Sequence, residues 1–203
     1  GRAAVPGLID NHNHIVLLGI RPGHHTPLEG AASIAEIQGI LKARAKNVPA
    51  GAFITSMGGW NQAHFAEKRL PTLAELDAAV PNHPVLVYQS FTGPAATNSR
   101  GLAFFKSKGV AVSDTGAIGA NAPSLAALNA LRAEQTFEDR KRGTTEAMAY
   151  SASVGVTTNA DMGAFNLPGT QNLQGSFEAD TLASADQFRM YDAFAALHRE
   201  GKL

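Results

Sequence analysis

The stretch PGLIDNHNH, residues 6–14, contains the strongest structural signal in this chain. It starts with Pro-Gly, continues through a short apolar run and ends in two histidines separated by one asparagine. A short apolar run bounded by turn residues predicts a buried β-strand. Since side chains two residues apart leave the same face of a strand, we expect His12 and His14 to point the same way.

Two imidazoles on one face of a strand can bind one metal ion together, and neutral imidazole is the commonest protein metal ligand. The chain contains no cysteine. Any metal site therefore has to use histidine, carboxylate or lysine-derived ligands. We predict His12 and His14 as metal ligands; the competing interpretation is a pair of hydrogen-bonded or surface histidines.

Outward from this stretch, strand and helix patterns alternate. Strands are predicted at residues 52–57, 84–88 and 155–160, and helices at residues 33–46, 72–79, 98–108, 124–133, 137–154 and 184–201. Capping-box spacing marks three of the helix starts, namely Ser33 with Glu36, Thr72 with Glu75 and Ser184 with Gln187. Residues 112–123 are rich in Gly and Asn and are predicted to be a surface excursion. The alternation predicts parallel strands with covering helices.

The composition excludes several function classes. The 203 residues include 17 Lys+Arg and 17 Asp+Glu, and no basic run is present, which argues against binding to nucleic acid or to an anionic membrane. The longest apolar run, residues 15–20, is far shorter than the roughly 20 residues that span a bilayer. Hydrophobic residues make up 44% of the chain, enough to fill a core. We expect a small-molecule partner.

Residues 6–14 resemble the first-strand signature of the metal-dependent amidohydrolase superfamily. Several further motifs are similar to its amidohydrolase-3 branch: Gly59-Trp60 followed by Phe65, Arg69-Leu70-Pro71-Thr72, Glu75-Leu76-Asp77, Val80-Pro81, Pro84-Val85 and Asn98-Ser99. Gly155-Val156-Thr157-Thr158 resembles the second barrel strand of the family. The similarity runs from Gly1 to Leu203 in the family's order.

This resemblance implies an α/β fold, a partial (β/α)8 TIM barrel with an inserted α/β segment. The first barrel strand and its loop would occupy about residues 1–30, the insertion about 31–135, and the second barrel strand with flanking helices about 136–203. A complete barrel takes about 250 residues. We therefore expect a fragment of a hydrolase catalytic domain, inactive alone, whose remaining ligands and catalytic groups lie beyond Leu203.

The resemblance also implies the chemistry. His12 and His14 would bind one or two divalent ions, usually zinc, and a metal-activated water would attack a carbonyl carbon. The expected reaction is hydrolysis of carbon–nitrogen bonds other than peptide bonds. Asn98 is implied as a substrate contact, but Gly93 stands where the branch commonly has a histidine, so the family's substrate is not carried over.

Trp60 and Asp161 each allow two interpretations. Trp60 follows two glycines, which let a backbone approach a ligand closely, so its ring either walls a substrate pocket or packs under a loop. Asp161 ends a predicted strand and either holds a metal-ligating histidine in place or caps a helix or loop. The other five histidines are expected to be structural or exposed, with His24 and His25 in a loop exposed to solvent.

Two rival functions are also compatible with this sequence. A catalytic zinc usually has three protein ligands plus water and this chain offers two, so the chain alone could be a non-catalytic α/β fragment that binds metal weakly or self-associates into a homo-oligomer. The other rival is a complete small binding domain that uses the loop of Trp60. A cytoplasmic location is favoured, with a signal peptide before Gly1 left open.

Overall fold

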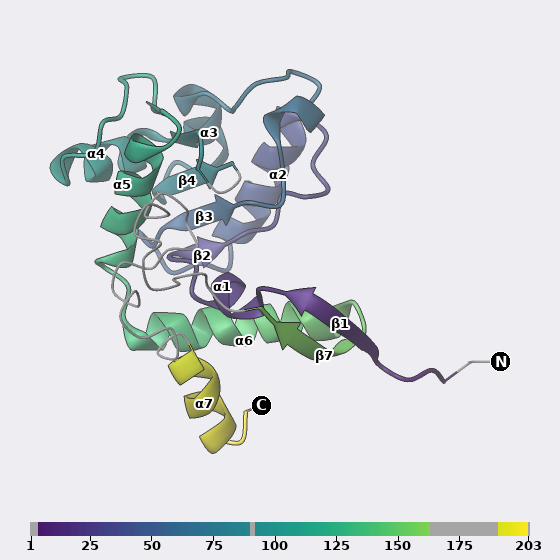
Figure 1. Ribbon diagram of the computed structural model, residues 1–203. Coiled ribbons are helices and arrows are strands. Elements are labelled where there is room, and N and C mark those ends of the chain that lie inside the picture. Colours follow the sequence, from purple (N-terminus) through teal and green to yellow (C-terminus); the bar gives the residue numbers. More distant parts are fainter. Residues whose placement is uncertain (1–3, 90–91, 163–190, 203) are drawn as a thin grey trace. The chain divides into compact units, whose positions relative to one another are not determined.

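The computed structural model describes residues 4–89, 92–162 and 191–202, and every structural statement below concerns these residues. The chain divides into two compact units (Figure 1). Of the described residues, 4–21, 136–162 and 191–202 belong to unit 1, and 22–89 and 92–135 belong to unit 2. No helix in the described ranges is long and apolar enough to cross a membrane.

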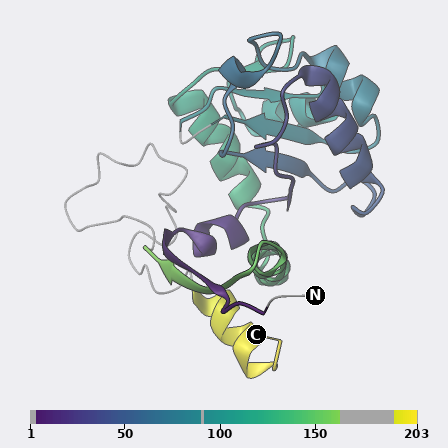
Figure 2. The same cartoon turned by 90° about the vertical axis from the view of Figure 1, so that its right-hand side faces the viewer.

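Unit 2 is built on a five-stranded sheet. Its elements in chain order are β2 (His24–His25), α2 (Ile34–Ala45), β3 (Ile54–Met57), the 3-10 helix η1 (Gln62–His64), α3 (Leu73–Ala79), β4 (Val85–Tyr88), β5 (Ala95–Thr97), α4 (Ser99–Ser107), β6 (Ala117–Ile118) and α5 (Ala122–Arg132). The strand order is β2-β3-β4-β5-β6. Helices cover both faces of this sheet (Figure 2). The structure thus confirms the predicted strands and helices of this segment to within a few residues.

The two faces of this sheet carry separate cores because successive strand residues alternate between them. Ile54, Val85 and Val87 pack with residues of α2 and α3. Met57, Leu86 and Tyr88 pack with residues of α4 and α5 on the other face. All residues of β3 and β4 are buried, as expected for strands covered on both sides.

The sheet is only partly parallel, so the prediction of parallel strands is wrong for its second half. β2, β3 and β4 run parallel, whereas β5 is antiparallel to both β4 and β6. The connection from β4 to β5 is too short for the helical crossover that parallel strands need. The predicted surface excursion at residues 112–123 likewise contains β6, whose Ile118 is buried.

Unit 1 contains β1 (Leu8–Asn13), α1 (Ile15–Gly19), α6 (Phe137–Ser153), β7 (Val156–Asp161) and α7 (Asp192–Arg199). β1 and β7 form a parallel two-stranded sheet, seen side by side in Figure 1. Helix α1 was not predicted from the sequence. It packs tightly on α6, where a Cβ at Gly143 would lie 2.1 Å from the carbonyl oxygen of Gly19.

The strand predicted within residues 6–14 is confirmed as β1, but its predicted burial is wrong. Leu8 and Ile9 are 58% and 70% exposed. The reason is that β1 pairs only with β7 among the described residues, so neither strand is enclosed by neighbours. The α/β class is confirmed, and no closed barrel occurs within the described ranges. The capping box predicted at Ser184 and Gln187 lies outside them.

Candidate functional site

His12 and His14 lie at the carboxyl end of β1. His12 is exposed and occupies the strand, while His14 is half-buried and is the N-cap residue of α1. Their rings are 5.9 Å apart between centroids and meet edge to face at 74°. The two predicted metal ligands are therefore neighbours in space.

The imidazole nitrogens of His12 and His14 are ligands of a kind that divalent transition metals bind. Two imidazoles this close together are suited to one ion, because zinc–nitrogen bonds measure about 2.0–2.1 Å and each ring can turn about its side-chain torsions. Within the described residues, no group of three or more His, Cys, Asp or Glu side chains is placed to hold a metal ion. A catalytic zinc usually has three protein ligands, and the pair offers two imidazoles.

Asp161 ends β7 beside the histidine pair, in register with Asn13. Its Oδ2 accepts a hydrogen bond of 2.8 Å from the backbone N–H of Val16, in the first turn of α1. Its Oδ1 accepts one of 3.1 Å from the hydroxyl of Tyr191. Burial, followed by the charge of Asp161, raises the pKa of Tyr191, which keeps this hydroxyl protonated as a donor. Asp161 therefore caps α1 directly after His14.

An asparagine pair beside the histidines was missed by sequence reasoning. Asn13 lies between them, and its Nδ2 donates to Asn159 Oδ1 across the two strands at 2.7 Å. The oxygen of Asn13 accepts from the N–H of Ile15, and Ser151 of α6 donates to Asn159. Asparagine is depleted in strands, so its recurrence in both β1 and β7 is the sequence signal that could have found this pair.

Trp60 lies inside unit 2 and packs rather than facing solvent. Its ring is 5% exposed and stacks on Phe65 with the centroids 5.5 Å apart. Both residues belong to the core formed by α2, α3 and one face of the sheet. Of the two interpretations open for Trp60, this arrangement matches packing under a loop.

Asn98 is completely buried and has its hydrogen-bonding capacity used within the fold. Its oxygen accepts from the N–H groups of Val85 and Gly101, and its amide nitrogen donates to the carbonyl oxygens of Val80 and His83. One side chain thus caps α4 and ties the start of β4 to the preceding turn. These four hydrogen bonds give Asn98 a structural role.

The remaining histidines lie outside β1 and α1. His24 and His25 form strand β2, where His24 is buried and His25 half-buried, so the expected solvent exposure of this loop is wrong. The reason is their pairing with Ile54 and Thr55 of β3. His83 is buried with its Nδ1 3.2 Å from the carbonyl oxygen of Ala52, while His64 and His198 are exposed, as expected of structural or surface residues.

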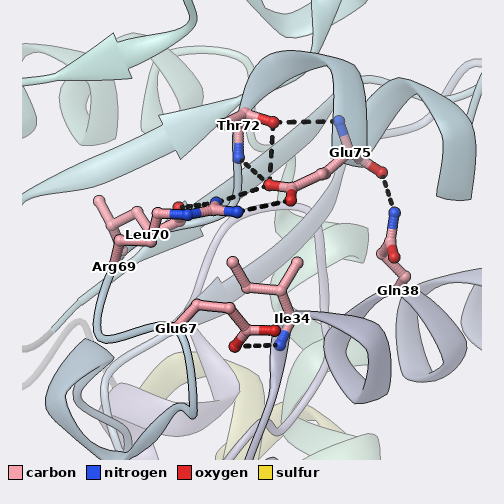
Figure 3. A network of polar contacts seen from close by, with 7 residues as sticks. All are labelled: Ile34, Gln38, Glu67, Arg69, Leu70, Thr72 and Glu75. Atoms are coloured by element: carbon pink, nitrogen blue, oxygen red, sulfur yellow. Dashed lines mark hydrogen bonds and ion pairs between the residues drawn. The ribbon is translucent and has the colours of Figure 1, made fainter.

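Several residues that carry the family resemblance form a structural network in unit 2 (Figure 3). Thr72 and Glu75 make a reciprocal capping box at the start of α3. Arg69 makes a two-pronged ion pair with Glu75, with both N–O distances at 2.8 Å. The Arg69 guanidinium and the Thr72 hydrogen bonds lower the pKa of Glu75 to about 2. This motif stabilises the fold.

Two solved structures share the fold of this chain. A metal-dependent hydrolase from Pyrococcus horikoshii OT3 superposes with a TM-score of 0.56 at 23% identity, over 98% of this chain and 35% of that one. A metal-dependent hydrolase from Pyrococcus furiosus gives a TM-score of 0.54 at 21% identity, again over 98% of this chain. At these identities the likeness shows a shared fold.

Curated proteins match over part of their length. N-substituted formamide deformylase from Arthrobacter pascens is 30% identical over 105 residues, 50% of this chain and 19% of that protein. Protein LONG AFTER FAR-RED 3 from Arabidopsis thaliana is 26% identical over 181 residues, 84% of this chain and 30% of that protein. The chain thus spans less than a third of either relative. The profile described as the amidohydrolase family matches residues 1–185, and the chain therefore belongs to the amidohydrolase family.

Proposed function

We propose that the full-length protein is a metal-dependent hydrolase of carbon–nitrogen bonds in small, non-peptide amides. His12 and His14 contribute two ligands to one or two divalent ions, zinc foremost. The observation that carries this proposal is the pair of imidazoles, 5.9 Å apart, at the carboxyl end of β1. In barrel enzymes this end of the strands carries the active site.

The roles of the chain's own residues follow from this placement. His12 and His14 hold the ion through ring nitrogens, because a histidine binds a metal in its neutral form. A divalent ion bound there supplies the Lewis acidity that activates water and polarises a carbonyl group. The catalytic acid or base and the remaining ligands are proposed to come from other parts of the full-length protein, since the chain spans less than a third of either relative.

The domain arrangement is part of the proposal. β1 and β7 pair in parallel although unit 2 lies between them in the chain. Unit 2 has its own sheet and two cores of its own. We take β1 and β7 as the first two strands of a (β/α)8 barrel, and about residues 31–135 as an α/β segment inserted between them.

The first substrates to test are N-substituted formamides, because a deformylase with that specificity in its name is 30% identical over 105 residues. The full-length protein is purified in three forms: wild type, His12→Ala/His14→Ala, and His64→Ala/His198→Ala as a control that removes two exposed histidines elsewhere. Metal content is measured by mass spectrometry and hydrolysis by release of formate.

The proposal expects metal and activity in the wild type and the control, and loss of both in His12→Ala/His14→Ala. Unchanged metal content and activity in that variant would overturn it. Metal retained through the two histidines without hydrolysis of any non-peptide amide would overturn the substrate class alone.

A second candidate concerns the 203-residue chain by itself: a non-catalytic fragment that binds metal weakly or self-associates into a homo-oligomer. It is favoured by the two-ligand donor set of the described residues and by the exposed apolar side chains Val5, Leu8 and Ile9. Light scattering and an amidase assay on this chain separate the two candidates. A monomer that hydrolyses N-acyl substrates would rule the second one out.

A further inference from the structure

The first turn of α1 is capped in an unusual way. Ser, Thr, Asp and Asn are the preferred N-cap residues because their oxygen accepts a hydrogen bond from the start of the helix. Here the N-cap residue is His14, and its side chain makes no capping hydrogen bond. The first N–H groups of the helix therefore need acceptors from other residues.

Two neighbouring side chains supply these acceptors. Asn13 Oδ1 accepts from the N–H of Ile15 at 3.2 Å, and Asp161 Oδ2 accepts from the N–H of Val16 at 2.8 Å. Both first N–H groups after His14 are thus bonded to residues other than His14 itself. The imidazole of His14 therefore does not serve as the cap of α1.

Each of the two capping groups is itself anchored. The amide nitrogen of Asn13 donates to Asn159 on β7, and the backbone carbonyl of Asn13 accepts from the N–H of Met162 at 2.8 Å. The second carboxylate oxygen of Asp161 accepts from the hydroxyl of Tyr191. The backbone on both sides of His14 is therefore fixed to β7.

We propose that Asn13 and Asp161 are positioning residues that cap α1 in place of His14 and so orient its imidazole toward a divalent metal ion. This inference rests on the proposed function. Hydrogen-bonding partners that orient metal ligands typically change metal affinity 10–100-fold when they are removed. Asn13 and Asp161 act through the backbone of His14, and neither is proposed as a ligand.

The test compares metal affinity in variants of the full-length protein. Asn13→Ala and Asp161→Ala each remove one cap beside His14. Thr136→Ala is the matched control, because it removes the side-chain cap of α6, in the same unit. Zinc dissociation constants are measured by competition with a chromophoric chelator, and visible absorption of bound Co²⁺ reports the coordination geometry.

We expect Asn13→Ala and Asp161→Ala to weaken zinc binding about 10–100-fold and to change the Co²⁺ spectrum. Thr136→Ala should lower thermal stability while leaving zinc affinity within about twofold, since it acts on the fold alone. Equal zinc affinities and spectra in all three variants would overturn the positioning role.

Conservative variants keep the test decisive if an alanine variant fails to fold. Asn13→Asp and Asp161→Asn each retain an oxygen that can accept from α1 but lose another hydrogen bond, because an aspartate cannot donate to Asn159 and an asparagine has one oxygen for both Val16 and Tyr191. Since the cap is then less well anchored, zinc affinity should fall between wild type and alanine or, without an alanine value, below wild type. A wild-type affinity in both would overturn the role.

His12→Ala/His14→Ala separates the two proposals. Zinc binding lost there but unaffected in the positioning variants overturns only this inference, and zinc binding unaffected there overturns both.

Discussion

The sheets of the two units differ in what surrounds their strands. β3 and β4 of unit 2 are buried along their whole length between two helical layers. β1 of unit 1 has exposed apolar residues at its start and polar residues at its end, where the histidine pair lies. Unit 2 is therefore stabilised by its own apolar cores. In unit 1, hydrogen bonds between β1, β7 and α1 hold the residues of the candidate metal site in place.

The largest expected effect compares one residue type in the two sheets. Ile54→Ala removes a completely buried side chain from β3 and should lower the free energy of unfolding by about 2–5 kcal/mol. Ile9→Ala on β1 removes a side chain that is 70% exposed and should change it by less than about 1 kcal/mol. Urea unfolding of the 203-residue chain measures both. Equal losses would break the comparison.

A buried polar group should matter almost as much in unit 2. Asn98→Ala leaves four buried backbone groups without their partner, with an expected loss of about 2–4 kcal/mol in the free energy of unfolding. Asn61→Ala is the matched control, because Asn61 is exposed and caps only η1. A mild effect of Asn98→Ala, together with altered substrate affinity in the full-length protein, would restore Asn98 as a substrate contact.

The network around Glu75 predicts a pH dependence for unit 2. The pKa of Glu75 is lowered to about 2 in the fold, from an ordinary value near 4.3. The carboxylate therefore stabilises the fold fully above the ordinary pKa, and this contribution disappears as the pH falls toward 2. Glu75→Gln should cost about 1 kcal/mol at pH 7 because the ion pair is partly exposed.

Urea unfolding of wild type and Glu75→Gln between pH 3 and pH 7 measures this dependence. The difference between the two proteins should shrink on acidification. A double-mutant cycle with Arg69→Ala should show that the two substitutions are coupled. A difference that stays constant with pH would contradict the ion-pair account.

The smallest effect uses Trp60, the only tryptophan of the chain, as a probe of unit 2. Its buried ring should give blue-shifted emission that acrylamide quenches poorly. Unfolding followed by this emission should shift to lower urea with Ile54→Ala and stay nearly unchanged with Ile9→Ala. Red-shifted, readily quenched emission from the folded chain would contradict the packing of Trp60 on Phe65.

Features with local causes could be predicted from the sequence. The start of α3 depends on Thr72 and Glu75, three residues apart, and its capping box is present in the structure. Ser33 likewise caps α2, although the carboxylate of Glu36 accepts from the N–H of Ala32 rather than closing a full box. β3 and β4 of unit 2 could be predicted because apolar, β-branched runs between turn residues are typical of strands.

Features that depend on distant partners could not be predicted. Helix α1 is five residues long, and one of its caps comes from Asp161, 145 positions beyond Val16. The exposure of β1 depends on how many strands flank it, which its apolar sequence does not reveal. The roles of Asn13 and Asn159 depend on strand register, and register is a property of the assembled sheet.

The central claim is that His12 and His14 form one divalent metal site. Isothermal titration of the metal-free full-length protein with Zn²⁺ tests it most directly, with His64→Ala/His198→Ala as the control. The account predicts that wild type and control bind zinc alike and that His12→Ala/His14→Ala loses at least one bound ion per chain. Equal zinc stoichiometry and affinity in all three proteins would contradict it.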